Sequence, residues 1–296
     1  MTIDIGPVGI WTGGLDSQPS AVGRVAAAEI EALGYTALWI PEAVGRDPLV
    51  AAALLLGATT RLRVATGIAN IYARDPMTMA AGQKTLAEAF PGRFLLGLGV
   101  SHRHLVARVR KHSYDKPYSY MVDYLQAMDE SLFHAVGPAD DPGRVLAALG
   151  PKMLELAATR ARGAHPYFVP VEHTALARQR MGPGALLAPE QMVVLERDPA
   201  TARAIARAGM AVYLRAPNYT NNLRRFGFDD DDLADGGSDR LVDAIVAWGG
   251  VEAVAERVRA HHDAGADHVC VQVLTAEAGR LPVAEWRELA PALVGG

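Results

Sequence analysis

Short apolar runs alternate with helix-period segments along most of the chain, and this alternation restricts the possible folds more than any other feature. The runs VGIW (8–11), ALWI (37–40), LRVATGI (62–68) and FLLGLGV (94–100) have no polar face. Strands of this kind are typical of parallel sheets that are covered by helices on both sides. About eight strand–helix units occur in the chain, which is the number in a (β/α)8 TIM barrel. A doubly wound open sheet is the alternative.

The second half of the chain continues the pattern. Further strands are expected at 144–150, 164–169, 191–196 and 268–274, and further helices near 173–181, 239–248 and 251–264. The residues between about 213 and 237 are too many for a simple strand–helix loop, and they combine amides, tyrosines and arginines. We therefore expect one TIM-barrel domain, 1–296, with an insertion at about 213–237 that serves as a substrate lid or as an oligomer contact.

Two helices carry apolar positions at helical spacing, and each set is expected to form a buried face. The first set is Val22, Val25, Ala26, Ile30 and Leu33, and the second is Met121, Tyr124, Leu125, Met128 and Leu132.

Composition excludes several classes of partner and site. The net charge of −4 provides no basic field for nucleic acid, and the longest apolar stretch (49–58) is shorter than the roughly 20 residues of a membrane span. The N-terminus lacks the pattern of a signal peptide. Cys270 is the single cysteine, which fits a buried strand thiol in a reducing cytoplasm.

Polar groups follow several expected strands, at the rim where TIM barrels place their active sites. Gly67–Asn70 forms an irregular exit from its strand, and the alternative is an ordinary turn formed by Asn70. Glu42 could act in proton transfer, or could be a helix N-terminal carboxylate. His102, after Ser101, has a side chain suited to acid–base chemistry, and the alternative is a surface loop histidine.

A helix start at Gly150-Pro151-Lys152 is a candidate anion site, because backbone N–H groups in a first helical turn lack helical partners. Plain capping of the helix is the alternative. His173 follows in a loop rich in proline and aromatic residues, and either faces the site or caps its helix. No metal site is expected, because His261, His262 and His268 have no carboxylate or cysteine at ligand spacing.

Six segments together resemble the luciferase-like (bacterial-luciferase-fold) oxidoreductases, and within them the branch that uses the deazaflavin coenzyme F420. They are LWIPEAVGRDP (38–48), ATGIANIYARDP (65–76), PGRFLLGLGVSH (91–102), LGPKMLELAA (149–158), LLAPEQMVVLE (186–196) and PNYTNNLRRFGF (217–228).

The resemblance implies a TIM barrel with insertions, often homodimeric, whose third strand bends through a non-proline cis peptide at Gly67–Ile68. It also implies contacts with the cofactor from Glu42 and from the bulge, the end of the fourth strand and a helix start. The implied cofactor-binding residues are Gly67, Ile68, Ala69, Asn70, Val100, Ser101, His102, Gly150, Pro151, Lys152 and Met153.

Two positions depart from the sugar-phosphate dehydrogenases of this family. Those enzymes have an Asp-His pair after the second strand and a Glu after the fourth, where this chain has Glu42-Ala43 and His102. The resemblance thus implies hydride transfer between the deazaflavin and another small organic substrate, with His102 and Glu42 as catalytic candidates. The alternatives are an FMN-dependent monooxygenase and a barrel that binds the cofactor without turnover.

Overall fold

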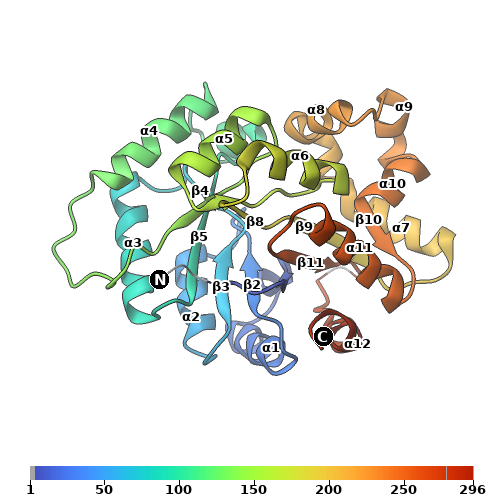
Figure 1. Ribbon diagram of the computed structural model, residues 1–296, viewed down its shortest axis with the longest axis horizontal. Coiled ribbons are helices and arrows are strands. Elements are labelled where there is room, and N and C mark those ends of the chain that lie inside the picture. The colour runs from blue at the N-terminus through green and yellow to red at the C-terminus, as the bar shows by residue number, and fades with distance from the viewer. Residues whose placement is uncertain (1–3, 278, 296) are drawn as a thin grey trace.

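The computed structural model describes residues 4–277 and 279–295 of the chain. Its sheet curls into a half-barrel, and helices surround the outside (Figure 1). The strand order is β10-β9-β11-β1-β2-β3-β5-β6-β7-β8, and the short strand β4 pairs with β5. The strand pairs found between described residues are parallel, so the predicted TIM-barrel architecture is confirmed.

The strands are short, as in most barrels of this kind. They are β1 (Val8–Trp11), β2 (Ala37–Ile40), β3 (Arg63–Thr66), β4 (Ala69–Asn70), β5 (Phe94–Gly99), β6 (Arg144–Leu146), β7 (Gly163–Ala164), β8 (Leu186–Leu187), β9 (Glu190–Val194), β10 (Val246–Trp248) and β11 (Val269–Val273).

The α-helices are α1 (Ser20–Ala32), α2 (Pro48–Leu56), α3 (Pro76–Ala89), α4 (Pro117–Asp129), α5 (Pro151–Arg160), α6 (Val171–Met181), α7 (Pro199–Met210), α8 (Pro217–Arg225), α9 (Asp230–Leu233), α10 (Asp239–Ile245), α11 (Val251–Asp263) and α12 (Val283–Leu293). Single turns of other helix types are η1 (Gly14–Ser17), η2 (His104–Val109), η3 (Tyr213–Arg215) and η4 (Ala234–Gly236).

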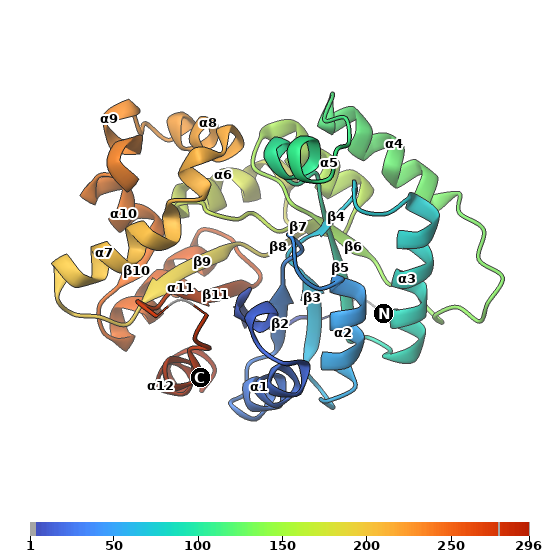
Figure 2. The same cartoon turned by 180° about the vertical axis from the view of Figure 1, so that it is seen from behind.

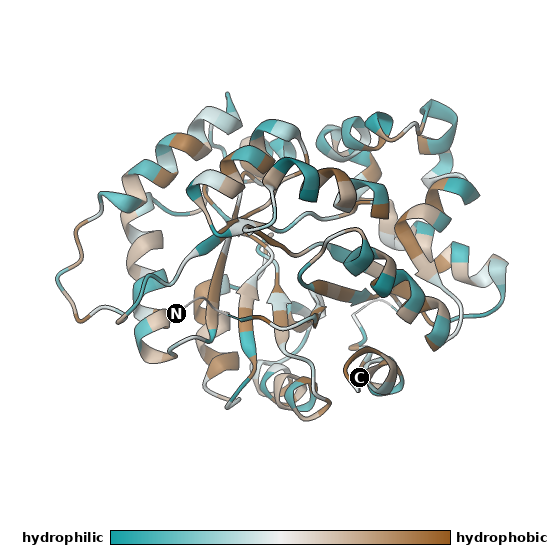
Figure 3. Cartoon of the chain, in the orientation of Figure 1, coloured by the Kyte–Doolittle hydropathy of each residue, from teal (hydrophilic) through white to brown (hydrophobic). Residues whose placement is uncertain are grey.

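The core forms where the apolar strands meet the inner faces of the helices, and Figure 3 shows this concentration of apolar residues along the sheet. Trp39 on β2 and Phe94 on β5 are almost completely buried. In the first half of the chain, strands and helices lie close to where the sequence predicts them, because starts such as Asp47-Pro48 and Asp75-Pro76 combine an N-cap with proline.

One predicted buried face is wrong in part. On α1, Ala26 and Ile30 are buried as expected, but Val22 and Val25 are 42% and 71% exposed. Small residues at positions 23 and 27 pack inward in their place, so the helix is rotated relative to the expected face. Beyond α4, Leu132 is also exposed, because the helix has already ended at Asp129.

The second half of the chain differs from its prediction in several elements. The segment 213–237, expected as an insertion, contains η3, α8, α9 and η4, and Asp229 and Asp232 form a capping box at the start of α9. The expected helix 239–248 ends at Ile245 and continues as β10. The expected strand 164–169 is reduced to β7. Helix α12, which follows β11, was not predicted.

The carboxyl ends of β1, β2, β3, β5 and β6 share one rim of the sheet because these strands are parallel neighbours. Helices α4, α5 and α8 lie toward this end of the molecule, whereas α1 and α12 lie at the opposite end (Figures 1 and 2). Between residues 4 and 277 and from 279 to 295, no helix has both the length and the apolar character needed to cross a bilayer.

Candidate functional site

The chain leaves β3 through an irregular bulge. Thr66 ends the strand, and the Gly67–Ile68 peptide that follows is cis. The short strand β4 then pairs with the end of β5, with Asn70 opposite Gly99. The Thr66 hydroxyl donates to the Gly97 carbonyl oxygen at 2.7 Å and accepts from the Gly97 N–H at 2.8 Å. This side chain therefore replaces the ladder hydrogen bonds at the point where the backbone departs from the sheet.

The two glycines of β5 make room for this bulge. A Cβ atom on Gly97 would lie 1.9 Å from the Thr66 carbonyl oxygen, and one on Gly99 would lie 2.4 Å from Ile68 Cδ1. Atoms cannot approach so closely, so any larger residue would displace the bulge. The glycine spacing of β5 and the irregular exit of β3 are thus two halves of one local structure.

Glu42, just after β2, is tied into the protein rather than pointing free at the rim. Its Oε2 accepts from the Asn70 backbone N–H at 2.7 Å and from Arg74 Nη1 at 2.8 Å. Its Oε1 accepts from Arg74 Nη2 at 3.0 Å, and Arg110 Nη2 lies 3.4 Å away. The Glu42 side chain is only 5% exposed, so these contacts form a buried anchor for the bulge.

Asn70 forms a local turn. Its side-chain oxygen accepts from the Tyr72 backbone N–H at 2.9 Å, and the residue is 2% exposed. The side-chain amide therefore shapes the exit toward α3, as the turn-forming alternative expects.

Ser101 and His102 follow β5. Ser101 has a left-handed backbone conformation, with φ of 55°, and its carbonyl oxygen accepts from the Tyr114 hydroxyl at 3.1 Å. His102 Nδ1 lies 3.3 Å from Asn218 Oδ1, and its ring centroid is 5.4 Å from that of Tyr219. Burial lowers the pKa of His102, and the hydrogen bond with Asn218 partly opposes that change.

The predicted helix start at 150–153 is the N-terminus of α5. Gly150 is the N-cap without a side-chain cap, Pro151 is the first helical residue, and Lys152 is exposed. A Cβ atom on Gly150 would lie 3.3 Å from Arg225 Nη1, so the Arg225 guanidinium lies beside the first turn. Two cations and the positive end of a helix dipole therefore meet here, an arrangement that favours an anion.

Helix α8 supplies further site residues, from a segment around Asn218–Asn222 that the sequence indicates as a whole but without individual roles. Asn218 and Tyr219 contact His102 from its first turn, and Arg225 reaches Gly150 from its last turn. Asn222 lies between them, is 1% exposed, and has a side-chain nitrogen without a hydrogen-bond partner. The mixed polar and aromatic composition of 213–228 was the available signal, but it did not assign individual roles.

Below the rim lies a buried group of polar and aromatic residues. Burial raises the pKa of Glu190 to about 8, and its Oε2 accepts from the Phe168 N–H at 3.2 Å. The Tyr167 hydroxyl lies 2.6 Å from the Tyr213 hydroxyl. Trp11 Nε1 has no hydrogen-bond partner, and it would lie 2.6 Å from a Cβ atom on Gly67.

Four of the other histidines and the cysteine are buried in the interior. His173 Nε2 donates to the Leu149 carbonyl oxygen at 2.9 Å, so it supports the chain just before α5. His261 is hydrogen-bonded to Gln191, and His268 is hydrogen-bonded to Trp39. Cys270 is buried, as expected for a strand thiol. Within the described part of the chain, no three His, Cys, Asp or Glu residues are grouped as metal ligands.

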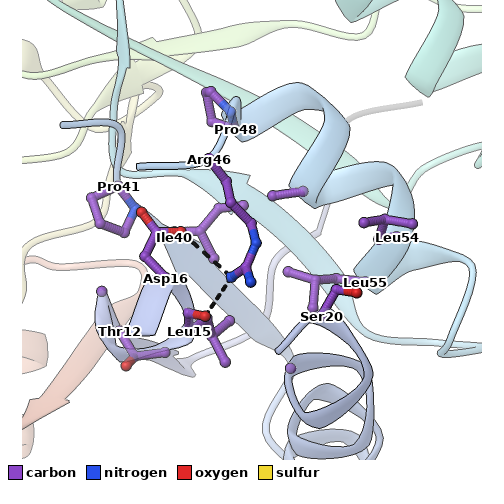
Figure 4. Close-up of a pocket in the computed structure, with 13 residues that line it drawn as sticks. Thr12, Leu15, Asp16, Ser20, Ile40, Pro41, Arg46, Pro48, Leu54 and Leu55 are labelled. Carbon is purple, nitrogen blue, oxygen red and sulfur yellow. Dashed lines mark hydrogen bonds and ion pairs between the residues drawn. The ribbon is translucent and has the colours of Figure 1, made fainter. Parts of the chain in front are cut away.

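A small pocket lies between α1 and α2, beside the carboxyl ends of β1 and β2. Figure 4 shows Arg46 extending across it toward Leu15, where its guanidinium donates to the backbone carbonyl oxygen. None of the predicted cofactor-binding residues lines this pocket.

The sequence profile described as luciferase-like monooxygenase matches residues 12–268. A Mycobacterium tuberculosis protein, provisionally named a coenzyme F420-dependent oxidoreductase, is 24% identical, with 91% of this chain and 96% of that protein aligned.

Solved structures of two kinds share the fold. An F420-dependent secondary alcohol dehydrogenase in complex with an F420–acetone adduct has a TM-score of 0.78 at 14% identity, with 99% of each chain covered. The oxygenating constituent of 3,6-diketocamphane monooxygenase from Pseudomonas putida, a type II Baeyer–Villiger enzyme in complex with FMN, has a TM-score of 0.67 at 15% identity, with 98% of each chain covered.

Proposed function

Because the chain belongs to the luciferase-like monooxygenase family, a family of enzymes, we propose that it is an F420-dependent oxidoreductase. In this proposal a hydride passes between C5 of the deazaflavin and a small organic substrate. One observation supports it above the others: the bulge after β3, the end of β5 and the α5 N-terminus after β6 lie on adjacent strands. A flat ring and an anionic tail therefore find suitable surroundings along one continuous rim.

The residues present fit such a cofactor. In the proposal, Gly67–Asn70 and Val100–His102 lie against the ring, and Gly150–Met153 holds the tail together with Arg225. The deazaflavin supplies the hydride chemistry, and the protein supplies placement and polarisation. Glu42 is proposed to act through the bulge, because its carboxylate already binds the Asn70 N–H and Arg74.

His102 is proposed as the residue that exchanges a proton with the substrate. It is only partly exposed, and its lowered pKa keeps the imidazole neutral near pH 7, when it can accept a proton. No carboxylate stands at the corresponding strand end in this chain, so imidazole is the available base there.

FMN is the second candidate cofactor, because a structural neighbour of the same fold is an FMN complex. Titration of the purified protein with F420 and with FMN, followed by cofactor fluorescence, separates the two. Tight binding of F420 with weak binding of FMN supports the proposal. Tight binding of reduced FMN with oxygen consumption, and no response to F420, would reject it in favour of a monooxygenase.

The tail site has a matched pair of variants on one helix. Arg225→Ala removes the guanidinium beside Gly150, whereas Arg224→Ala removes its neighbour, which pairs with Asp230. We expect Arg225→Ala and Lys152→Glu to weaken F420 binding at least about tenfold, as loss of a charge-assisted contact would. Arg224→Ala should bind as the wild type does. Equal affinities for the Arg224 and Arg225 variants would contradict this placement of the tail.

A homodimer in a reducing cytoplasm completes the proposal. Support comes from exposed apolar side chains on three consecutive helices, namely Val25 on α1, Val50 on α2 and Met77 on α3. Val50→Asp should shift the protein toward monomer in light scattering. The control is Val212→Asp, at a similarly exposed valine between α7 and η3. A monomeric wild type, or no difference between the two variants, would reject this interface.

A further inference from the structure

We propose that Asn218 is a positioning residue that fixes the tautomer of His102, so that Nε2 is the nitrogen that exchanges a proton with the substrate. This inference rests on the proposed function for its chemical meaning. Its structural part, the tautomer, can be measured without cofactor or substrate.

The geometry begins with the contact between the two side chains. His102 Nδ1 lies 3.3 Å from Asn218 Oδ1, across 116 positions of sequence. An amide oxygen can only accept a hydrogen bond, so Nδ1 must carry the hydrogen. In a neutral imidazole the other nitrogen, Nε2, is then left with its lone pair.

The hydrogen bond with Asn218 is the polar contact that acts on the His102 ring. Burial and the Asn218 bond determine the shift in the pKa of His102, and the neighbouring Tyr219 ring packs at 5.4 Å. Tyr114, whose hydroxyl donates to the carbonyl oxygen of Ser101, carries the Arg103 guanidinium over its ring at 5.5 Å. Arg103 is therefore engaged with an aromatic face next to the histidine.

Asn218 is held in place by the construction of α8. Pro217 occupies the first helical position and sets the backbone angle there, and Asn218 follows it. The buried side chains Tyr219, Asn222 and Leu223 fix the helix against the barrel. Asn218 itself is exposed, so its role is not to fill the core.

The proposed proton transfer is balanced when the substrate is an alcohol. As the C–H bond breaks and its electron pair leaves as hydride to the deazaflavin, the O–H bond breaks and its proton moves to Nε2. A C=O bond forms, and the imidazole becomes imidazolium with Asn218 Oδ1 accepting from Nδ1–H. Reduction of a carbonyl substrate runs through the reverse transfers.

The test is 15N NMR of the histidine side chains of the full-length protein, with the His102 signals assigned by comparison with His102→Gln. The wild type should show a protonated Nδ1 and an unprotonated Nε2. Asn218→Ala should lose this preference, and Asn218→Asp should raise the pKa of His102 by about one to two units because a carboxylate stabilises imidazolium. Asn221→Ala, one turn further along the same exposed helix face, should change neither.

A wild-type signal with the hydrogen on Nε2, or an unchanged tautomer in Asn218→Ala, would overturn the inference. Circular dichroism and thermal melting check that each variant is folded, and the exposed position of Asn218 makes unfolding unexpected. Failure of F420 to bind would reject the proposed function while leaving the measured tautomer standing. The two conclusions therefore fail separately.

Discussion

Replacement of Glu42 tests whether this carboxylate is the anchor of the bulge. The Glu42 and Arg74 side chains are 5% and 10% exposed, and two hydrogen bonds of 2.8 and 3.0 Å join them. Removing one partner of a buried ion pair costs roughly 3–5 kcal/mol, and loss of Glu42 leaves Arg74 paired with the more exposed Asp47 alone among the carboxylates bonded to it. Glu42→Ala should therefore lower the free energy of unfolding by about that amount.

Glu42→Gln gives an intermediate expectation. The glutamine carbonyl oxygen can still accept from the Asn70 N–H, but the charge-assisted bonds to Arg74 are lost, at a cost of about 1.5–3 kcal/mol. Asp47→Asn is the matched control, because Asp47 also pairs with Arg74 but is 44% exposed. Asparagine preserves its N-cap role, so the control should cost at most about 1 kcal/mol.

Urea unfolding followed by circular dichroism measures all three variants under one set of conditions. Glu42→Ala combined with Arg74→Ala should cost less than the sum of the two single changes, because each single change already breaks the pair. If Glu42→Gln costs no more than Asp47→Asn, the anchor assigned to Glu42 is wrong.

Three further predictions concern the interior. Burial raises the pKa of Glu190 to about 8, so this carboxyl holds its proton more tightly in the folded protein than in the unfolded chain. The stability that it contributes is therefore full below about pH 4.5 and declines as the pH rises to 8. Glu190→Gln should remove this decline, so the stability of the variant relative to the wild type should rise between pH 5 and pH 8 by at most about 1.4 kcal/mol per pH unit. A difference that stays constant with pH would contradict the raised pKa of Glu190. Gly97→Ala, which would put a methyl group 1.9 Å from the Thr66 carbonyl oxygen, should cost at least about 1–3 kcal/mol in urea unfolding, whereas Gly184→Ala meets no atom within 4 Å and should be nearly neutral. Cys270 should react with a thiol reagent only after unfolding, and rapid modification of the native protein would show that the thiol is accessible.

Local chemistry explains why much of the barrel could be predicted from the sequence. The run 37–40 is apolar at every position, and the strand it forms is buried on both faces. Asp75-Pro76 combines a side-chain cap with the fixed backbone angle of proline, and α3 begins there. Signals of this kind depend on a few consecutive residues, so they do not require knowledge of the fold.

The contacts that form the candidate site depend on the fold. His102 meets Asn218, and Gly150 meets Arg225, only because α8 packs over the rim from a distant part of the sequence. Glu42 follows its strand as predicted, yet its role depends on Asn70 and Arg74, which lie about thirty positions away. Helix α8 itself was missed because it is short and rich in amides and arginines, with few apolar residues. Tertiary burial of residues such as Tyr219 stabilises it.

The nine residues of helix α8 contact two different parts of the proposed site. Its first turn reaches the histidine proposed for proton exchange, and its last turn reaches the helix start proposed to hold the cofactor tail. Under these two proposals, exchange of this segment for the corresponding one of a relative would alter reactivity and cofactor preference in a single step. A change in reactivity during evolution or engineering would then be constrained by cofactor preference, and the reverse, unless the two ends of the helix are altered separately.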